Sequence, residues 1–178
     1  MQLNQSDREE PFAESDHVDR VREQWRQQWP ELDTGPLGVV GRVGRLREFF
    51  DRRLEEFFGA YGLTRQAWDV LAACRRAGRP YELTPSALSA ALMRTSGAVT
   101  HTLQRLEYAG LVTRVPSATD QRSLLVRLTP AGKRLVDKVA PKHLENERKL
   151  LSTLDESEQE ALANLLKRLL FALENPSR

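Results

Sequence analysis

The fold is decided by residues 96–132, which read SGAVTHTLQRLEYAGLVTRVPSATDQRSLLVRLTPAG. The first part has apolar residues at helical spacing, and Gly110 follows as the residue type that ends helices in a left-handed conformation. This pattern predicts a helix over Ser96–Ala109. The second part predicts a β-hairpin. Its elements are the strands Leu111–Val115 and Leu124–Leu128 and the polar connection Pro116–Ser123.

Helix start signals upstream of this stretch and at its end complete a winged helix-turn-helix. Thr64, Thr84 and Thr129 are good N-cap residues, and the last two precede a proline, which suits the first helical position. They predict the helices Arg65–Ala77, Pro85–Leu92 and Pro130 to about Leu150. We therefore expect a mainly α (α+β) fold, with a small β-hairpin wing inside an all-helical dimerisation frame.

The frame is predicted from both ends of the chain. Ser15-Asp16 can cap a helix that Pro30 ends, and a long amphipathic helix follows the linker Glu31–Pro36. Asp155, with Glu158 three residues later, can cap a leucine-rich last helix. The apolar faces of the long and last helices exceed what one small lobe can cover. We therefore favour a homodimer over packing within one chain.

Composition excludes several classes of protein. The 178 residues suit about one domain, and 40% apolar with 29% charged residues is typical of a globular chain rather than a disordered tail. No apolar run approaches the roughly 18 residues of a membrane span, so no membrane partner is expected. The single cysteine, Cys74, excludes a disulfide framework and indicates the cytoplasm. It lies on the inner face of its helix, which favours a core residue over a redox sensor.

The net charge of +2 is unevenly distributed. Residues 1–34 carry a net charge of −5 and residues 35–93 carry +3. Residues 94–134 carry +5, and residues 135–178 carry −1. A basic island in a nearly neutral chain is the electrostatic pattern expected of an element that binds a polyanion.

The predicted helix within this island has the layout of a DNA-reading helix. Its inward stripe leaves a polar outer face with Ser96 at its start, and Gln104 and Arg105 match the edges of adenine and guanine respectively. The alternative is a merely solvated helix face. The predicted base-reading residues are Ser96, Thr100, His101, Gln104 and Arg105.

The hairpin favours DNA binding over that alternative. Arg114 precedes its polar connection and Arg122 lies within it. An arginine on a projecting loop can enter a narrow minor groove. Asp120 would disfavour phosphates unless it braces an arginine through a charge-assisted pair. Helix and hairpin together predict double-stranded DNA as a partner.

Several motifs resemble the MarR family of bacterial transcriptional regulators. Asp120-Gln-Arg122 followed by Leu128-Thr129-Pro130-Ala131-Gly132 is similar to the wing signature of that family. Upstream matches occur in the same order, at Leu63-Thr64, Trp68, Leu71, Leu88-Ser89 and Leu106-Glu107 to Gly110-Leu111. The resemblance covers roughly residues 37–173. It implies a homodimer that binds a palindromic operator, usually as a repressor relieved by a small molecule, with Arg122 in the minor groove and Asp120 as its brace.

The N-terminal helix resembles an extension found in the urate-responsive branch of that family. The resemblance implies ligand contacts at Trp25, Asp69 and Arg76, whereas Thr102 stands where the branch has a further arginine. It therefore leaves open whether the effector is urate, a smaller or less acidic aromatic molecule, or none. Trp25 either contacts the ligand or anchors the dimer interface. Arg76 and Asp69 could form an ion pair on the helix Arg65–Ala77. An anionic ligand competing for Arg76 would then free Asp69 and shift that helix.

No residue set points to catalysis, to a metal or to a cofactor, so we expect a protein that is not an enzyme. Gly38, Gly41 and Gly44 lack the dinucleotide-binding spacing and indicate close helix packing. The main alternative function is a winged-helix module for protein–protein dimerisation without DNA readout. The expected organisation is a flexible tail (1–14), N-terminal dimerisation and ligand helices (15–62), a DNA-binding lobe (63–134) and C-terminal dimerisation helices (135–178).

Overall fold

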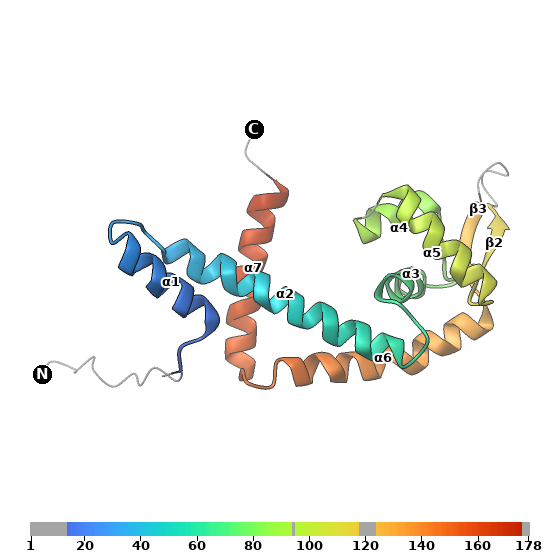
Figure 1. Ribbon diagram of the computed structural model, residues 1–178. Coiled ribbons are helices and arrows are strands. Elements are labelled where there is room, and N and C mark those ends of the chain that lie inside the picture. Colours follow the sequence, from blue (N-terminus) through green and yellow to red (C-terminus); the bar gives the residue numbers. More distant parts are fainter. Residues whose placement is uncertain (1–13, 94, 118–123, 176–178) are drawn as a thin grey trace, which may run out of the picture. The chain divides into compact units, whose positions relative to one another are not determined.

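The computed structural model describes residues 14–93, 95–117 and 124–175 (Figure 1). The chain divides into two units, Met1–Arg52 and Arg53–Arg178, and the boundary falls inside one long helix. In the described residues no helix is long and apolar enough to cross a membrane. The predicted flexible tail lies almost wholly outside the described residues.

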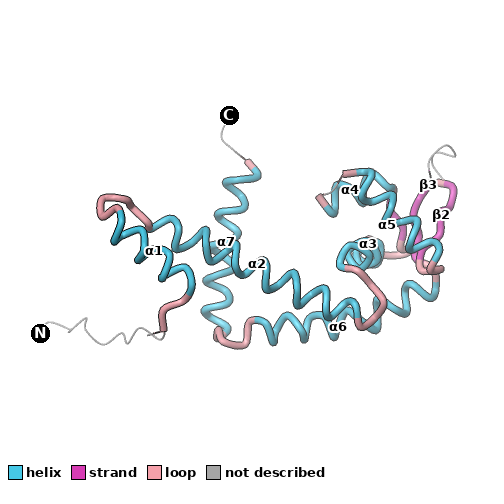
Figure 2. The backbone as a smooth tube through the Cα atoms, viewed as in Figure 1, coloured by secondary structure: helices cyan, strands magenta, loops and turns pink. Residues whose placement is uncertain are grey.

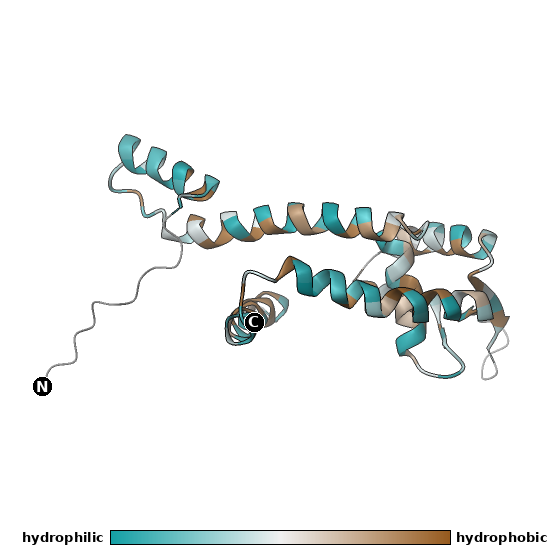
Figure 3. Cartoon of the chain, turned by 90° about the horizontal axis from the view of Figure 1, so that it is seen from below, coloured by the Kyte–Doolittle hydropathy of each residue, from teal (hydrophilic) through white to brown (hydrophobic). Residues whose placement is uncertain are grey.

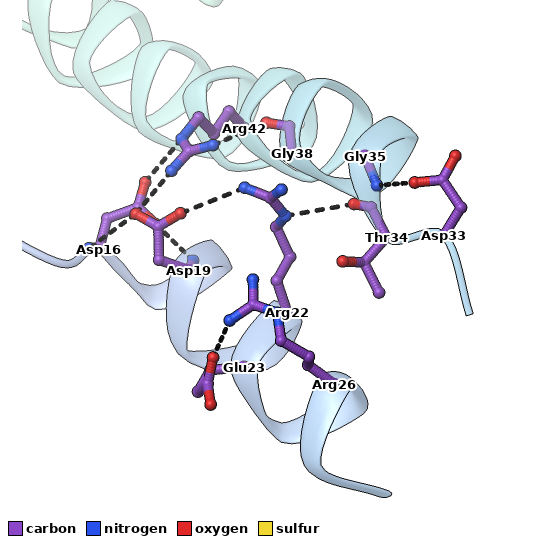
Figure 4. A network of polar contacts seen from close by, with 10 residues as sticks. All are labelled: Asp16, Asp19, Arg22, Glu23, Arg26, Asp33, Thr34, Gly35, Gly38 and Arg42. Carbon is purple, nitrogen blue, oxygen red and sulfur yellow. Dashed lines mark hydrogen bonds and ion pairs between the residues drawn. The ribbon is translucent and has the colours of Figure 1, made fainter. Parts of the chain in front are cut away.

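The first unit is a helical hairpin made of α1 (His17–Gln28) and the first part of α2 (Gly35–Gly59). The predicted cap is confirmed, because the Asp16 carboxylate accepts a hydrogen bond from the backbone N–H of Asp19 at 2.8 Å. The carboxylates of Asp16 and Asp19 bind the guanidinium of Arg42 on α2 at 2.9 and 2.7 Å respectively (Figure 4). The backbone N–H of Asp19, followed by Arg42, holds the pKa of Asp16 below its ordinary value. Charge pairs thus join the start of α1 to α2.

Close packing between these helices explains one of the three glycines, Gly41. Val18 is buried, and a Cβ atom at Gly41 would approach its methyl groups to 3.2 Å. A Cβ at Gly38 would lie 3.4 Å from the guanidinium of Arg22, which itself donates to the carbonyl of Thr34. Nothing lies within 4 Å of a Cβ at Gly44. The prediction of close helix packing therefore holds at Gly41, whereas Gly38 makes only ordinary contact with arginine side chains and Gly44 has no such neighbour.

The long helix begins earlier than the sequence indicated. The predicted linker extended to Pro36, whereas α2 starts at Gly35. Proline is tolerated in the first turn of a helix, where its missing N–H has no intrahelical acceptor. Pro36 was therefore a start signal rather than the end of the linker.

The second unit contains the winged-helix elements in the predicted order (Figure 1). Thr64, Thr84, Thr129 and Asp155 each accept the expected capping hydrogen bond at a helix start. Gly110 has a φ of 68°, as predicted for the end of the helix that begins at Ser96. The elements are α3 (Arg65–Arg76), β1 (Glu82–Leu83), α4 (Pro85–Leu92), α5 (Ser96–Tyr108), β2 (Val112–Pro116), β3 (Leu124–Leu128), α6 (Pro130–Leu150) and α7 (Glu156–Glu174).

The sheet has one more strand than the sequence predicted. In the described residues, antiparallel strands follow the order β1-β3-β2, so β3 is central. Figure 2 shows β2 and β3 as neighbouring magenta strands. The two strands of the predicted hairpin pair from Val112 with Leu128 to Pro116 with Leu124. The added strand β1 pairs Glu82 with Arg127. Two residues are too few to show the alternation by which strands are recognised in a sequence.

The core of this unit joins α3, α4, α5, the sheet and α6. Leu71, Leu88 and Leu103 are almost completely inaccessible, and Val126 of β3 packs with them. Cys74 is also fully buried, and burial raises the pKa of its thiol to about 11. The interpretation of Cys74 as a core residue is therefore confirmed.

Candidate nucleic-acid interface

One face of helix α5 is buried in the core, and the opposite face is exposed to solvent. Val99, Leu103 and Leu106, whose helical spacing predicts the inward stripe, are at most 3% exposed. Thr100, His101, Gln104 and Arg105 are exposed as predicted, and Tyr108 is 97% exposed. Ser96 begins the helix. Burying one face anchors the helix without using any side chain of its polar face.

A cavity lies beside this polar face. It has a volume of about 580 Å³ and is bounded by the start of α3, with Gln66 and Ala67, and by α5. His101, Thr102 and Arg105 line it from α5. Thr102 is half-buried, and its hydroxyl donates to the carbonyl of Ala98 at 3.0 Å. His101 and Arg105 thus border both the exposed face and the cavity.

Glutamate residues hold two arginines of the wing strands. Arg114 on β2 donates through Nε to Oε2 of Glu107 on α5, at 3.0 Å. Arg127 on β3 pairs with Glu82 on β1 at 2.6 Å. Such partly exposed pairs contribute little to stability, but they restrict the positions of the guanidinium groups. Arg114 is therefore oriented towards the C-terminal end of α5.

The predicted minor-groove pair, Asp120 and Arg122, lies outside the described residues. The ladder between β2 and β3 continues to Pro116, the first residue of the polar connection, which pairs with Leu124, the residue immediately after the connection. The paired strands therefore bring the two ends of that connection together.

The segment Leu128–Gly132 joins the wing to α5 and α6. The Thr129 hydroxyl donates to the carbonyl of Gly110 at 2.7 Å and accepts from the N–H of Gly132 at 3.0 Å. A Cβ atom at Gly132 would lie 2.0 Å from the carbonyl oxygen of Leu111. Only glycine permits this approach, so the segment sets the position of the wing strands relative to α5.

A second charge cluster connects α3 to α6. Arg75 donates to Oδ1 of Asp137 at 2.8 Å, and Lys133 binds the other carboxylate oxygen. Both cations lie over the ring of Tyr81, at 5.0 and 5.8 Å from its centroid. Lys133, followed by Arg75, holds the pKa of Asp137 below its ordinary value. The cluster links the end of α3 to the start of α6.

Comparison with known proteins agrees with this geometry. Residues 61–123 match the sequence profile of the MarR family. The HTH-type transcriptional regulator PecS of Dickeya dadantii is 40% identical over 151 residues, which cover 85% of this chain and 91% of PecS. The chain belongs to the MarR family.

Solved MarR-family structures are similar over most of the chain. AbsC from Streptomyces coelicolor aligns with a TM-score of 0.72 and 25% identity, over 81% of this chain and 97% of AbsC. A mutant of MarR from Escherichia coli, complexed with operator DNA, aligns with a TM-score of 0.66 and 28% identity, over 82% of this chain and 97% of that one. The winged-helix fold predicted from the sequence is therefore confirmed.

The ligand residues inferred by resemblance belong to two different units, each of which is described by itself. Trp25 belongs to the first unit and is partly exposed, whereas Asp69 and Arg76 belong to α3 in the second unit. Asp69 is half-buried and Arg76 is exposed. None of the three lines the cavity beside α5, whereas Thr102 does. The assignment of ligand contacts to these residues stays a prediction.

Sequence reasoning missed the roles of Glu107, Glu82 and Asp137. A signal existed for Glu107, since residues 94–134 contain 2 acidic residues and it is one of them. No comparable signal marked Glu82 or Asp137, because their partners Arg127 and Arg75 lie 45 and 62 residues away. Pairs at such separations become visible only when the MarR fold is in place.

Proposed function

We propose that this protein is a homodimeric, sequence-specific DNA-binding transcriptional regulator of the MarR family. It acts as a repressor in the bacterial cytoplasm, and a small effector, such as an anionic aromatic molecule, relieves its binding to a palindromic operator. The observation that carries the proposal is the polar face of α5, exposed and anchored from behind by three buried apolar residues. In the winged-helix lobe, α5 has the position of the helix that winged-helix proteins place in the major groove of DNA.

The chemistry of that face suits base readout. The Gln104 side chain can make paired hydrogen bonds to adenine, and the Arg105 guanidinium can do so to guanine. The Arg105 guanidinium has no ion-pair partner among the described residues, so DNA need not displace a carboxylate. Arg114, braced by Glu107, is suited to a backbone phosphate, and Arg122 to the minor groove. The +5 charge of residues 94–134 supports association with a polyanion.

Uncovered apolar surface supports the homodimer in each unit separately. Hydrophobic residues recur along α2, visible as brown bands between teal ones (Figure 3), and Val39, Val40 and Val43 are substantially exposed. In the other unit, Leu165, Leu169 and Phe171 of α7 are more than half exposed. Apolar surface of this extent needs a partner, and two copies would also supply two reading helices for a palindrome.

The cavity beside α5 supports relief by a ligand. A molecule held there would contact His101 and Arg105, which the proposal also assigns to DNA. Ligand and operator would then compete for the same groups, and each would weaken the other by the same factor. Trp25, Asp69 and Arg76 remain the further contacts inferred from the urate-responsive branch.

Genomic footprinting with the purified full-length protein tests the proposal. We expect protected palindromes whose half-sites lie about one helical turn, or 10–10.5 base pairs, apart. On such a site, Gln104→Ala or Arg105→Ala should cost about 1–3 kcal/mol at particular bases. Arg122→Ala should weaken binding to all sequences and reduce its salt dependence. No protected site, together with a stable dimer, would instead favour the protein–protein dimerisation module.

A further inference from the structure

Tyr81 lies at the base of the wing and has an unusual backbone conformation. Its φ is 68°, in the left-handed region that bulky side chains rarely adopt. It directly precedes strand β1, and its side chain is half-buried. A residue keeps such a conformation only where the contacts around it outweigh the cost, and residues of this kind gather at functional sites. The contacts of Tyr81 therefore indicate what this conformation is for.

The backbone of Tyr81 is bonded to the end of the central strand β3. Its carbonyl oxygen accepts a hydrogen bond from the N–H of Leu128, the last residue of β3, at 3.0 Å. Its own N–H donates to the carbonyl of Gly78 at 2.6 Å, in the turn that follows α3. The next residue, Glu82, pairs with Arg127 of β3 at 2.6 Å. Tyr81 and its neighbour thus hold the point at which β3 ends and α6 is about to begin.

The ring of Tyr81 is held by two cations from two different helices. The guanidinium of Arg75, near the end of α3, lies 5.0 Å from the ring centroid, and the ammonium of Lys133, near the start of α6, lies 5.8 Å from it. Cations over an aromatic face are attracted by the quadrupole of the ring. Asp137 binds both cations, so moving either one away from the ring also breaks an ion pair. The ring therefore joins the base of the wing to both helices.

A small rotation at the base of β3 produces a larger displacement at its other end. The strand runs from Leu128 back to Leu124, which is about 13 Å at the usual rise per residue of a strand. A rotation of about 10° at Leu128 would therefore move Leu124 by roughly 2 Å. Binding groups must be held within about 0.5 Å of their productive positions. Because β2 pairs with β3 along its length, both ends of the polar connection would be displaced together.

The same contacts contribute little to the stability of the fold. The side chains of Arg75, Lys133 and Asp137 are 36 to 39% exposed, and ion pairs and cation–ring contacts at such positions are weak. The core of this unit consists instead of buried apolar side chains. The cluster around Tyr81 therefore acts on orientation more than on stability.

We propose that Tyr81 and the three charged side chains around it are a positioning device for DNA binding. They set the angle of the wing strands against α3 and α6, and thereby how well the wing meets the minor groove. This inference rests on the proposed function, in which Arg122 of the wing enters that groove. The proposed function assigns no DNA contact to any of the four side chains. The major-groove contacts of α5 do not depend on them.

The test measures binding of the full-length protein to the labelled palindrome that footprinting protects, by fluorescence anisotropy. Tyr81→Asn removes the ring but keeps a residue type that tolerates the left-handed backbone. Tyr81→Phe keeps the ring and removes only the hydroxyl group. Asp137→Asn removes the charge that holds both cations. Its matched control is Glu145→Gln, which breaks an ion pair between two residues of α6 alone.

We expect Tyr81→Asn to raise the operator Kd by about tenfold, because a misaligned wing loses most of its contact. Asp137→Asn should raise it by about threefold, since the cations are then held less firmly over the ring. Tyr81→Phe and Glu145→Gln should stay within about twofold of the wild type.

A double-mutant cycle separates positioning from a general loss of structure. In the Arg122→Ala background the wing contact is already absent, so Tyr81→Asn should add less than about twofold to the Kd. In the Gln104→Ala background the wing contact is intact, so Tyr81→Asn should still cost about tenfold. A substitution that merely destabilised the lobe would cost the same in both backgrounds.

The inference is overturned alone if Arg122→Ala weakens operator binding and Tyr81→Asn does not. It is also overturned by equal costs of Tyr81→Asn in the two backgrounds, or by a Tyr81→Phe variant that binds as weakly as Tyr81→Asn. If Arg122→Ala binds like the wild type, the minor-groove contact of the proposed function fails, and this inference fails with it. Should Tyr81→Asn not fold, Asp137→Asn, which alters a partly exposed side chain, takes its place in the cycle.

Discussion

The helices α5 and α7 have similar apolar stripes but differ in what covers them. In α5, Leu103 is 2% exposed, because α3, α4 and the sheet enclose it. In α7, Leu169 is 51% exposed, and no residue of this helix, all of which is described, is buried. Helical periodicity thus identifies the apolar face in both cases, but not whether the same chain covers it. The following predictions test that difference, from the largest expected effect to the smallest.

Truncation of the covered stripe should have the largest effect. Leu103→Ala leaves a cavity in the core and should lower the free energy of unfolding by about 2–5 kcal/mol. Urea denaturation measures the loss. The loss should be the same at all protein concentrations at which the wild type and the variant are dimeric to the same extent. A loss well below about 1 kcal/mol would mean that α5 is not packed as described.

Truncation of the uncovered stripe should act through association instead. Leu165→Ala/Leu169→Ala should weaken the dimer by about 2–3 kcal/mol, as sedimentation equilibrium would measure. Its effect on unfolding should fall away at dilutions where the wild type is already monomeric. Lys167→Ala, on the other side of the same helix, is the control. Equal losses at all concentrations would place these leucines in a core of their own chain.

The junction between wing and helix should show an intermediate effect. Gly132→Ala places a methyl group on the carbonyl of Leu111, so either strand or helix must shift. Overpacking of this kind costs about 1–3 kcal/mol, which thermal unfolding would detect. Ala131→Gly, at the exposed neighbouring position, should cost less than about 1 kcal/mol. Comparable losses would mean that the close approach is not required.

The charge cluster on α6 should have the smallest effect and should depend on pH. The folded pKa of Asp137 lies below its ordinary value of 3.8, so its contribution is present above that value and is lost as pH falls through the folded pKa. Asp137→Asn should therefore unfold earlier than wild type at about pH 6, and the difference should shrink towards about pH 3. Melting curves at both pH values give the comparison. A difference that grows in acid contradicts the assignment.

Local signals in the sequence predicted much of this fold. Thr64, Thr84, Thr129 and Asp155 cap the helices that they were expected to cap, because a cap needs only a side chain and the N–H groups of the next turn. The inward stripe of α5 was also predicted, since 3.6-residue periodicity is a property of one helix. Strand β1 was missed because it is defined by its partner β3 rather than by its own two residues.

The candidate interface was predictable only in part, for a related reason. Which side chains α5 exposes follows from its own stripe, so Gln104 and Arg105 were accessible to sequence reasoning. That Glu107 restrains Arg114 depends on how β2 returns beside α5. The cavity at His101, Thr102 and Arg105 depends on how the start of α3 lies against the same helix.

The sequence by itself determined the helices, the wing strands, the basic island and the motifs of the MarR family. The tertiary structure decided the third strand, the carboxylates that restrain Arg114 and Arg127, the glycine contact at Leu111 and the two cations on the ring of Tyr81. The physical reason is the distance along the sequence over which each kind of interaction acts. Capping and periodicity act within about one or two helical turns, whereas ion pairs, cavities and cation–ring contacts depend on residues that only folding brings together.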